Sequence, residues 1–373
     1  MAEYGKIKVE KGLLNTAVRR FLTSLLEEGM VDSVLAPRKV HSGKSFVQTL
    51  ASDPKSIENI SPISPVMPIN SAKIVSDITI LEPSPKKIAV VLKPCEMRAL
   101  VELVKLNQAS LENIITIGMD CVGTYSVVDF ERMVQEKKNA FNDYTKLAAQ
   151  GKDVPGVRTA CQVCEYPVSE LVDINICLVG YDTSKGLILK ANTKEGEEII
   201  KKLGIGDKDD SKRERKMLDL IATRIANRDR MMQELTDLFK GEDHTALLEF
   251  FSTCIGCRNC VSVCPICYCR ECFFDSQTFD QHSERYLKMA RRKGMIKMPT
   301  DTLLFQVTRF VHMVTSCVAC GMCEQACPSG IPLLSIYKTV GFNAQKEFDY
   351  VPGRDIEEEL PLTTFREDEL EPR

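Results

Sequence analysis

Two runs of four cysteines constrain this chain more than any other feature of its sequence. Each run spaces its cysteines by two, two and three residues and ends in Cys-Pro, as in "CIGCRNCVSVCP" (254–265) and "CVACGMCEQACP" (317–328). Three thiolates on one tight loop can bind three irons of a [4Fe–4S] cube, and the fourth cysteine, on a following turn, binds the other cube. The spacing therefore predicts two cubes that exchange their fourth ligands.

The exchange assigns every cysteine of the two runs to a cube. The predicted ligands are Cys254, Cys257, Cys260 and Cys327 for one cube and Cys317, Cys320, Cys323 and Cys264 for the other. Zinc ribbons use paired CxxC motifs and not four-cysteine runs that end in Cys-Pro, which disfavours zinc. Three more cysteines, Cys267, Cys269 and Cys272, follow the first run. Local packing or part of another site remain the alternatives for these three, and no cube is assigned to them.

The composition indicates where such a chain works. The 373 residues include 16 cysteines, and 49 basic against 52 acidic residues give a net charge of −3. This balance predicts no whole-chain attraction to nucleic acid or anionic lipid. No apolar run is long enough to span a bilayer, and the N-terminus has no apolar core of a secretory signal. We expect a cytoplasmic protein, in which clustered CxxC spacing indicates cluster ligation and not disulfides.

The first half of the chain alternates between apolar strands and amphipathic helices. Residues 13–30 predict a helix, 31–40 an alternating strand, and 43–70 a loop. Further apolar strands are expected within 86–92, within 113–119 and at 174–182. A Lys-Pro-Cys turn and a helix follow the first of them. Strand–helix–strand order with reactive residues at strand ends is typical of an open α/β sheet whose site lies at the carboxyl edge. The predicted fold class is a mixed α/β sheet domain, a helical connector and a ferredoxin-like segment.

Four cysteines outside the two runs are expected to meet at that sheet edge. Cys95 and Cys121 follow predicted strands, and Cys161 and Cys164 form a "CQVC" motif. Because neighbouring parallel strands deliver their carboxyl ends to one edge, these four residues are candidates for a third [4Fe–4S] cluster. Unpaired core thiols, zinc and a redox disulfide remain the alternatives. Cys177 lies inside an apolar strand and is expected in the core.

The chain divides into four predicted parts. Residues 205–245 are highly charged with a helical apolar period, which predicts a connector. The expected domains are an α/β flavin- or coenzyme-type domain (1–200), the connector (201–250), a two-cluster domain (251–340) and an acidic C-terminal tail (341–373).

Several segments together resemble one protein family. They are "KPCEMRALVELVKLNQ", "IGMDCVGTYS", "CQVCEYPV", "CIGCRNCVSVCPICYCRECFF", "CVACGMCEQACPSGIPL" and "FDYVPG". In this order they resemble the β subunits of coenzyme F420-dependent hydrogenases and formate dehydrogenases. The formate dehydrogenase β subunits are the more similar, because they also carry the two-cluster segment. The chain looks like a bacterial-type variant: it has no glycine-rich N-terminal segment and no Cys-Gly-Asn-Trp-Gly stretch.

The resemblance implies an iron–sulfur flavoprotein subunit that binds FAD and exchanges a hydride with a soluble carrier. F420, NAD(P)H and ferredoxin are the candidate carriers, and formate or hydrogen chemistry belongs to a partner subunit. The expected FAD-binding residues are Asn70, Lys93, Arg98 and Arg158; the basic ones could instead balance the charge of a cluster. No GxGxxG motif follows a strand, and no catalytic residue is assigned. A flavin-free electron-wire subunit that docks partners is the alternative.

Overall fold

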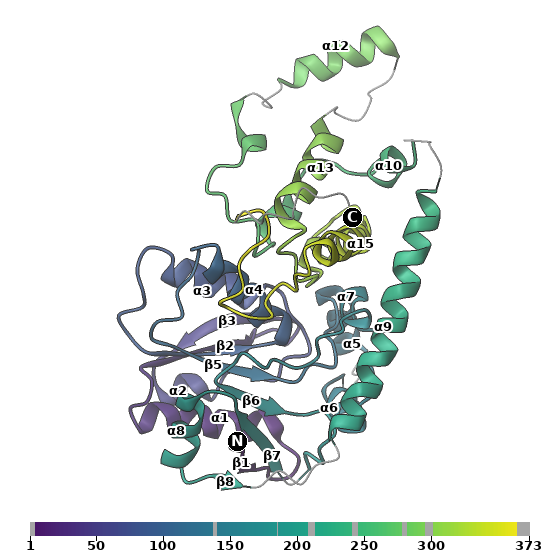
Figure 1. Ribbon diagram of the computed structural model, residues 1–373. Coiled ribbons are helices and arrows are strands. Elements are labelled where there is room, and N and C mark those ends of the chain that lie inside the picture. The colour runs from purple at the N-terminus through teal and green to yellow at the C-terminus, as the bar shows by residue number, and fades with distance from the viewer. Residues whose placement is uncertain are drawn as a thin grey trace.

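The computed structural model describes residues 4–136, 140–184, 186–207, 213–240, 245–277, 282–294 and 301–363. Its N-terminal part is an eight-stranded mixed sheet, and its C-terminal part is helical and lies at one end of the sheet (Figure 1). The strands run in the order β3-β2-β4-β5-β6-β7-β1-β8 across the sheet. Their bounds are β1 Tyr4–Lys8, β2 Ser33–Lys39, β3 Phe46–Ala51, β4 Ile88–Leu92, β5 Ile114–Met119, β6 Ile174–Cys177, β7 Gly186–Ala191 and β8 Gly206–Asp207.

The centre of the sheet is parallel and its margins are antiparallel. Strands β2, β4, β5 and β6 pair in parallel, whereas β3, β7, β1 and β8 pair antiparallel to their neighbours. Every residue of β4, β5 and β6 is buried, as parallel strands covered on both faces require. The mixed α/β fold class is thus confirmed, and the carboxyl ends of β4, β5 and β6 share one edge.

Two sequence expectations about strands are corrected by this sheet. The strand expected at 31–40 is β2, but its first five residues are all buried and do not alternate. The loop expected over 43–70 is wrong at Phe46–Ala51, which forms the edge strand β3 and pairs with β2 through a tight turn closed between Val40 and Ser45. The β-branched and aromatic residues Phe46, Val47 and Thr49 favour that pairing although Ser and Pro surround it.

A separate core packs on each face of the sheet. Val34, Ala89 and Val91 point to the face that α1 covers, whereas Leu35 and Val90 point to the face that α3 and α4 cover. Side chains of a strand alternate between faces, so neighbouring residues serve different cores. The helices of this part are α1 Leu14–Glu27, α2 Pro54–Ile57, α3 Ser71–Thr79, α4 Pro94–Lys105, α5 Val127–Gln135, α6 Ala140–Gln150, α7 Thr159–Gln162 and α8 Lys194–Lys202.

Helix α4 starts directly at the end of β4. Pro94 is its first residue, which suits a proline because the first helical N–H has no intrahelical partner. The expected Lys-Pro-Cys turn is therefore the first turn of the helix, with Cys95 on it. The buried Glu96 carboxylate accepts hydrogen bonds from the backbone N–H of Lys93 (2.8 Å) and of Ser71 (2.9 Å). These bonds fix the starts of α3 and α4 to each other at the sheet edge.

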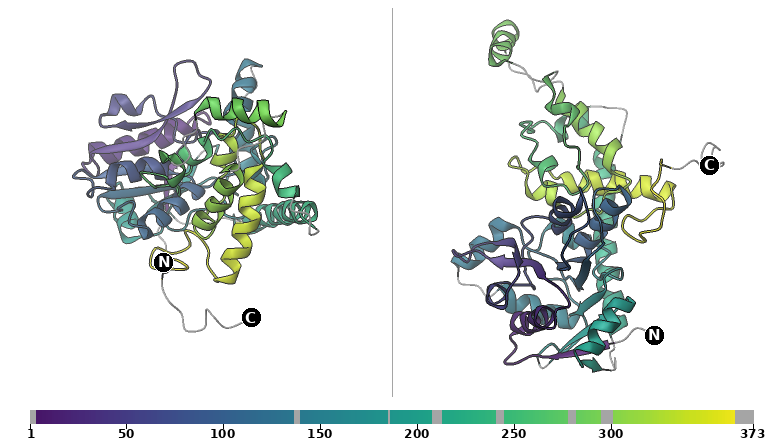
Figure 2. Two further views of the ribbon diagram at one scale, coloured as in Figure 1. Left: turned by 90° about the horizontal axis from the view of Figure 1, so that it is seen from above. Right: turned by 90° about the vertical axis from the view of Figure 1, so that its left-hand side faces the viewer.

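Helix α9 Arg213–Leu238 runs along the sheet domain toward the C-terminal helices (Figures 1 and 2). It packs on α7 near the sheet edge and on α15 near the cysteine runs. The remaining elements are α10 Thr245–Phe250, α11 Asn259–Ser262, the 3-10 helix Phe273–Asp275, α12 Ser283–Lys293, α13 Asp301–Met313, α14 Met322–Gln325 and α15 Leu333–Glu347. Helices α8 and α15 cross two of the predicted domain boundaries, at 200 and at 340. The division into domains itself stays a prediction.

The segment after α15 returns to the sheet domain and packs on α4; we call residues 348–363 the strap. The Glu102 carboxylate of α4 accepts hydrogen bonds from the hydroxyl of Tyr350 (2.6 Å) and the N–H of Gly353 (2.8 Å). Arg98 Nε donates to the carbonyl of Pro352 (2.9 Å). Part of the predicted acidic tail is thus attached to the surface of the sheet domain.

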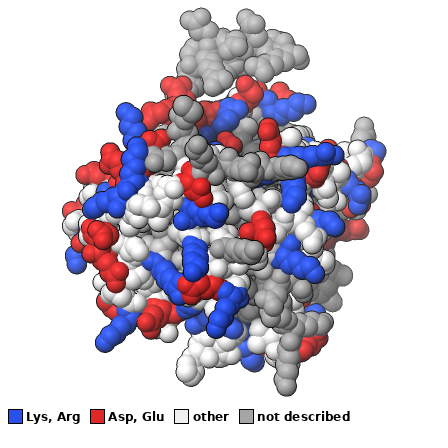
Figure 3. Space-filling model, turned by 90° about the horizontal axis from the view of Figure 1, so that it is seen from below, with Lys and Arg blue, Asp and Glu red and all other residues white. Residues whose placement is uncertain are grey.

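Positive and negative side chains are interspersed on the face of the molecule shown in Figure 3. This matches the near balance of 49 basic and 52 acidic residues in the sequence. Within the described parts of the chain, no helix has both the length and the apolar character needed to cross a bilayer.

Candidate metal centres and an adjoining pocket

The two cysteine runs adopt the same backbone conformation. Gly256 and Ala319, each just before the second cysteine of its run, have φ of 67° and 55°. Arg258 and Gly321, each just after that cysteine, have φ of 58° and 69°. A left-handed residue on both sides of the second cysteine turns the loop back on itself, which brings thiols only a few residues apart around one space. A short helix follows in each run, α11 in the first and α14 in the second, and the two helices pack together.

Four thiols from both runs surround one small cavity. Cys254, Cys257 and Cys260 line it from the first run, and Cys327 lines it from the second. Of the other four cysteines of the runs, Cys264 and Cys323 pack in one apolar cluster. Burial, and after it the charge of the neighbouring Cys264, raises the pKa values of Cys317, Cys320 and Cys323. We call these sets the outer quartet (Cys254, Cys257, Cys260, Cys327) and the middle quartet (Cys264, Cys317, Cys320, Cys323).

The three additional cysteines behave differently from one another. Cys267 contacts Met313 and donates a hydrogen bond to Cys264. This hydrogen bond and the charge of Arg309 lower the pKa of Cys264 to about 6, although burial opposes them. Cys272 is partly buried and Cys269 is exposed. The structure thus places Cys267 beside the middle quartet and leaves Cys269 at the surface.

A third set of four thiols lines a cavity at the carboxyl edge of the sheet. Cys95 comes from the first turn of α4, Cys121 follows β5, Cys161 lies on α7, and Cys164 lies just beyond α7. We call this set the edge quartet. Its members are separated by up to 69 positions in sequence (95 to 164), so only the sheet and α7 bring them together.

Buried positive charges accompany the edge quartet. Arg158 lines the cavity, donates from Nε to the hydroxyl of Thr124 (3.0 Å), and has Nη2 3.8 Å from Cys161 Sγ. Burial raises the pKa of Cys161, but Arg158 and two hydrogen bonds from Thr124 outweigh it, so the pKa of this thiol lies below its usual value. Burial and Cys161 raise the pKa of Cys121 to about 11, and Lys93 opposes that rise. The cavity therefore favours thiolates at some positions more than at others.

Sequence reasoning missed a second arginine at this cavity. Arg224 of α9 is 1% exposed; its Nε donates to Asp153 (2.8 Å), and its Nη1 donates to the carbonyls of Cys121 (3.3 Å) and Cys164 (3.4 Å). It follows Met217 and Leu220 in the buried stripe of the helix. A charged residue within a buried helical stripe was the available signal, because such a charge requires partners.

The donor sets fit iron–sulfur cubes by their chemistry. Each quartet supplies four thiols around a cavity or a common space, and thiolates bind the four separate irons of a cube. In the described part of the chain, no three His, Cys, Asp or Glu side chains are grouped closely enough to hold a single metal ion. The assignment of individual cysteines as ligands stays a prediction.

The edge and middle quartets adjoin each other at the loop that carries Cys320. Cys320 of the middle quartet also lines the edge cavity, together with Ala319 and Ala160. A Cβ atom on Gly321 would lie 2.4 Å from the Cβ of Ala160, which is closer than real side chains approach. Arg258 holds the equivalent left-handed position in the first run, so a side chain is compatible with the backbone there. Glycine at 321 is therefore required by the contact between the two sites.

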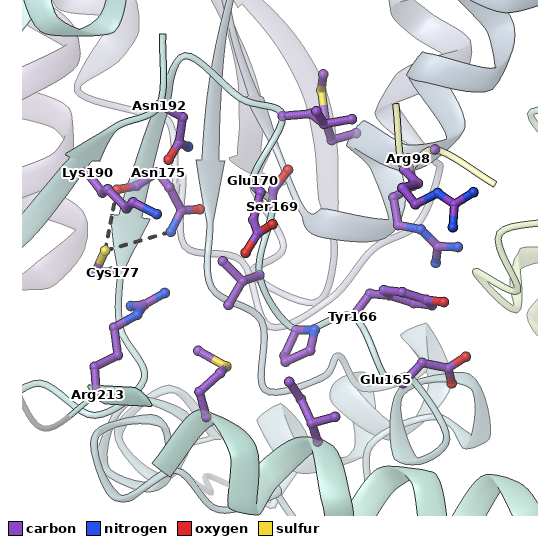
Figure 4. Close-up of a pocket in the computed structure, with 18 of the residues that line it drawn as sticks. Arg98, Glu165, Tyr166, Ser169, Glu170, Asn175, Cys177, Lys190, Asn192 and Arg213 are labelled. Carbon is purple, nitrogen blue, oxygen red and sulfur yellow. Dashed lines mark hydrogen bonds between the residues drawn. The ribbon is translucent and has the colours of Figure 1, made fainter. Parts of the chain in front are cut away.

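A larger pocket of about 780 Å3 adjoins the edge quartet. Arg98 and Tyr166 lie at one end, and Asn175, Cys177 and Arg213 lie at the other (Figure 4). Tyr166 also lines the edge cavity, so this residue belongs to the walls of both spaces. The guanidinium carbon of Arg98 lies 3.8 Å from the Tyr166 ring centroid and holds that ring in place. The strap closes one side of the pocket with Val351, Gly353 and Arg354.

The far end of the pocket is fixed by a buried ion pair. Asp120, which is fully buried, accepts hydrogen bonds from Arg213 (2.5 and 2.7 Å), from Asn175 (2.9 Å) and from two backbone N–H groups after β6. The Asn175 side-chain oxygen is buried without a hydrogen-bond partner among the described residues. Cys177, expected in the core, is buried, and it also lines this pocket.

The pocket is large enough for a flavin nucleotide, but most of the residues expected to bind FAD lie outside it. Its volume lies within the range of about 300–1,000 Å3 typical of ligand sites. Of the four residues expected to bind FAD, only Arg98 lines it. Asn70 caps α3 through a hydrogen bond to the Ala72 N–H, Lys93 is buried beside Cys121, and Arg158 lines the edge cavity. The four residues therefore do not surround one cavity.

Comparisons with known proteins match both parts of the chain. A family profile that describes the C-terminal region of the coenzyme F420 hydrogenase/dehydrogenase beta subunit matches residues 85–208. A second, described as "4Fe-4S dicluster domain", matches residues 249–331. The first match contains the edge quartet, and the second contains all eight cysteines of the two runs.

Two curated relatives extend over nearly the whole chain. The F420-dependent formate dehydrogenase subunit beta of Methanocaldococcus jannaschii is 26% identical over 91% of this chain and 92% of its own length. The F420-dependent formate dehydrogenase 1 subunit beta of Methanococcus maripaludis is 28% identical over 94% of this chain and 93% of its own length.

A solved structure is also similar. It is a chain of the F420-reducing [NiFe] hydrogenase complex from Methanosarcina barkeri, with a TM-score of 0.43, 15% identity, and coverage of 63% of this chain and 91% of that chain. The family matches and the two near full-length relatives agree with the order of sites along the sequence. This chain is thus similar to coenzyme F420 hydrogenase/dehydrogenase β subunits, whose family profile matches residues 85–208, and it carries a 4Fe-4S dicluster domain at residues 249–331.

Proposed function

We propose that this chain is the electron-transfer β subunit of an oxidoreductase complex of the formate dehydrogenase or hydrogenase type. In this proposal the outer, middle and edge quartets each hold a [4Fe–4S] cube, and the pocket beside Tyr166 holds FAD. A soluble carrier exchanges a hydride at that pocket, and formate or hydrogen reacts on a partner subunit. F420 is the first candidate carrier, because the two curated relatives are F420-dependent formate dehydrogenase subunits.

The continuous row of sites is the observation that carries the proposal. Tyr166 belongs to the walls of both the pocket and the edge cavity. Cys320 belongs to the middle quartet and lines the edge cavity. Cys264 of the middle quartet and Cys260 of the outer quartet lie in one apolar cluster. Each site thus shares a residue or a packed core with the next, which is what electron transfer over short steps requires.

In this proposal, some residues bind the cofactor in the pocket and others surround the thiols of the three quartets. Arg98, at one end of the pocket, supplies positive charge for an anionic cofactor, whereas Arg213 at the other end is paired with Asp120. Asn175 offers a free acceptor oxygen at the far end. Arg158 and Arg224 offset the negative charge of four thiolates in the edge cavity, where burial alone would favour protonated thiols. An apolar cluster packs around the outer and middle quartets and buries Cys260 and Cys264, whereas Cys257 of the outer quartet is exposed to solvent.

The proposed cofactors supply chemistry that side chains do not have. A flavin converts between two-electron hydride transfer and single-electron transfer. Iron–sulfur cubes carry single electrons at potentials set by charge, hydrogen bonds to sulfur and exposure.

Quantifying iron, sulfide and flavin on protein purified without oxygen tests the proposal. We expect about twelve irons per chain, four for each of three cubes, and one FAD released when the clusters are bleached with acid. About eight irons would remove the edge site from the proposal. A colourless protein that binds zinc would overturn it as a whole.

Adding reduced F420, NADH or NADPH to the oxidised protein then identifies the carrier. One of them should bleach the cluster absorbance if the pocket holds a flavin. Absence of flavin together with a full iron content would instead support the alternative of a flavin-free electron-wire and docking subunit. Full iron, bound flavin and no response to any of the three would leave ferredoxin as the carrier to test.

A further inference from the structure

The inner face of α13 carries buried polar side chains that the proposed function does not yet use. Arg309 is 4% exposed and Gln306 is 1% exposed. Both lie on the helix whose apolar residues Phe305 and Met313 join the cluster around the outer and middle quartets. A buried charge costs free energy unless its surroundings compensate it, so its position requires an explanation.

Arg309 is held by contacts to the outer quartet and to an aromatic ring. Its Nη2 donates to the carbonyl of Cys260 (3.3 Å), and its Nη1 donates to Gln306 Oε1 (3.4 Å). Its guanidinium carbon lies 4.9 Å from the ring centroid of Tyr337. Its Nε is buried and has no hydrogen-bond partner among the described residues. The group therefore has an N–H left to donate to something that the polypeptide does not supply.

Arg309 also lies beside residues that pack on the middle quartet. Its Nη2 is 3.8 Å from Met313 Sδ, and the same methionine sulfur is 2.8 Å from Cys267 Sγ. Met313 belongs to the apolar cluster that also contains Cys264 and Cys323. The guanidinium thus contacts the outer quartet directly and packs on the cluster that holds thiols of the middle quartet.

Among the described residues, the Gln306 side chain contacts a thiol of the outer quartet and none of the middle quartet. Its Nε2 lies 3.9 Å from Cys254 Sγ, to which it donates, and its Oε1 accepts hydrogen bonds from Arg309 and from the Tyr337 hydroxyl (both 3.4 Å). The amide is therefore oriented by two donors, with its N–H group directed at a sulfur of the outer quartet.

We propose that Arg309 is a positioning residue whose fixed charge raises the reduction potentials of both C-terminal cubes, and that Gln306 raises that of the outer cube alone. The inference rests on the proposed function, because it requires cubes at the two quartets. A cube that accepts an electron becomes more negative, so a buried positive charge nearby favours the reduced form. Hydrogen bonds to cluster sulfurs act in the same direction. A guanidinium keeps its proton throughout the working pH range, so its effect is constant.

Redox titration followed by electron paramagnetic resonance tests this on the full chain, purified with its clusters under anaerobic conditions. In Arg309→Gln we expect both C-terminal potentials to fall. The equilibrium constant for reducing at least one of the two cubes should fall tenfold or more. For a one-electron couple, a tenfold fall lowers the reduction potential by about 59 mV. In Gln306→Leu only one potential should fall. The potential of the edge cluster should not change in either variant. Arg230→Gln, the same substitution at an exposed position of α9, is the matched control and should leave all potentials unchanged.

Two more variants separate charge from packing. Arg309→Met fills the apolar space without charge and should behave like Arg309→Gln, whereas Arg309→Lys keeps the charge and should stay closer to the unmodified protein. If both neutral variants lose iron and Arg309→Lys keeps it, the charge is needed to hold the cubes, which supports its action on them. Neutral variants with full iron and unchanged potentials would overturn the inference, as would loss of iron in all three. Absence of iron from the unmodified protein would instead refute the proposed function.

Discussion

The edge quartet and the two C-terminal quartets bring four thiols together by different routes. The C-terminal thiols are brought together by local spacing, since two loops of equal conformation each supply three and exchange a fourth. The edge thiols come from α4, the end of β5, and the α7 region, so the sheet must form before they can meet. The two C-terminal sites therefore depend on short segments of the chain, whereas the edge site depends on the whole sheet domain.

The two regions also hold charge differently. At the edge cavity, Arg158 comes from the loop before α7 and Arg224 comes from α9. Asp120, next to Cys121, pairs with Arg213 at the start of α9. At the C-terminal quartets, Arg258 lines the outer cavity and Arg309 donates to the carbonyl of Cys260. Damage to α9 should therefore affect the edge site first.

Removing one thiol from each region should produce the largest difference. Cys121→Ser and Cys257→Ser should each lower the iron content by about four atoms per chain. Cys121→Ser should also stop the soluble carrier from reducing the remaining cubes, because the edge site lies between the pocket and the C-terminal quartets; dithionite should still reduce them. Iron analysis and cluster bleaching measure both effects. Full iron in Cys121→Ser would contradict a cluster at the edge.

Neutralising Asp120 should weaken the edge site without affecting the C-terminal one. Asp120→Asn leaves the buried Arg213 guanidinium without its carboxylate, which should cost about 3 kcal/mol of stability and reduce iron at the edge quartet. The thermal unfolding midpoint and the iron content measure this. Asp77→Asn, at an exposed position of α3, is the control. Equal unfolding midpoints in the two variants would show that the ion pair does not hold the edge together.

Separating the two regions where Gly321 packs on Ala160 should have a smaller effect. Gly321→Ala forces a Cβ atom to within 2.4 Å of Ala160, and overpacking of this kind costs about 1–3 kcal/mol. Gly256→Ala is the matched control, because its φ of 67° is similar and no atom lies within 4 Å of an added Cβ. We expect slower electron transfer from the edge cluster to the middle one in Gly321→Ala only, measured by stopped-flow bleaching. Equal rates in both variants would mean that this contact does not set the distance.

Loosening the strap should have the smallest effect. Glu102→Gln removes the charge that pairs with Lys105 and weakens the hydrogen bonds from Tyr350 and Gly353, at a cost of about 1–2 kcal/mol. Limited proteolysis within 348–363 should become faster, and flavin should dissociate more readily because the strap closes one side of the pocket. Glu112→Gln, at an exposed position, is the control. Unchanged proteolysis would show that Glu102 does not hold the strap.

Sequence patterns predicted the parallel centre of the sheet but not its margins. Strands β4, β5 and β6 are apolar runs, each followed by a turn or a helix. Both faces of these strands are buried, so nearly every residue is apolar and the sequence reveals them. Strand β3, at the edge, lies among Ser and Pro residues and has exposed positions. Its pairing with β2 is set by the neighbouring strand, and no local pattern encodes that.

The residues around the sites were less predictable than the thiols. The spacing of cysteines 254–264 and 317–327 is a local property, so it fixes which loops can form. Arg224 and Arg309 are single charges in helices, and nothing in a linear sequence says that their partners are backbone carbonyls of residues 121, 164 and 260. Glycine at 321 likewise has a reason only once Ala160 is seen opposite it.

By itself, then, the sequence determined that eight thiols would lie on two matching loops, since ligand spacing acts over a few residues and survives in any fold. Tertiary structure alone decided that the edge quartet, the pocket behind Tyr166 and the loop at Gly321 would lie in one row. That row depends on the order of strands and on the path of α9, and both are set by burial of apolar faces across the whole domain.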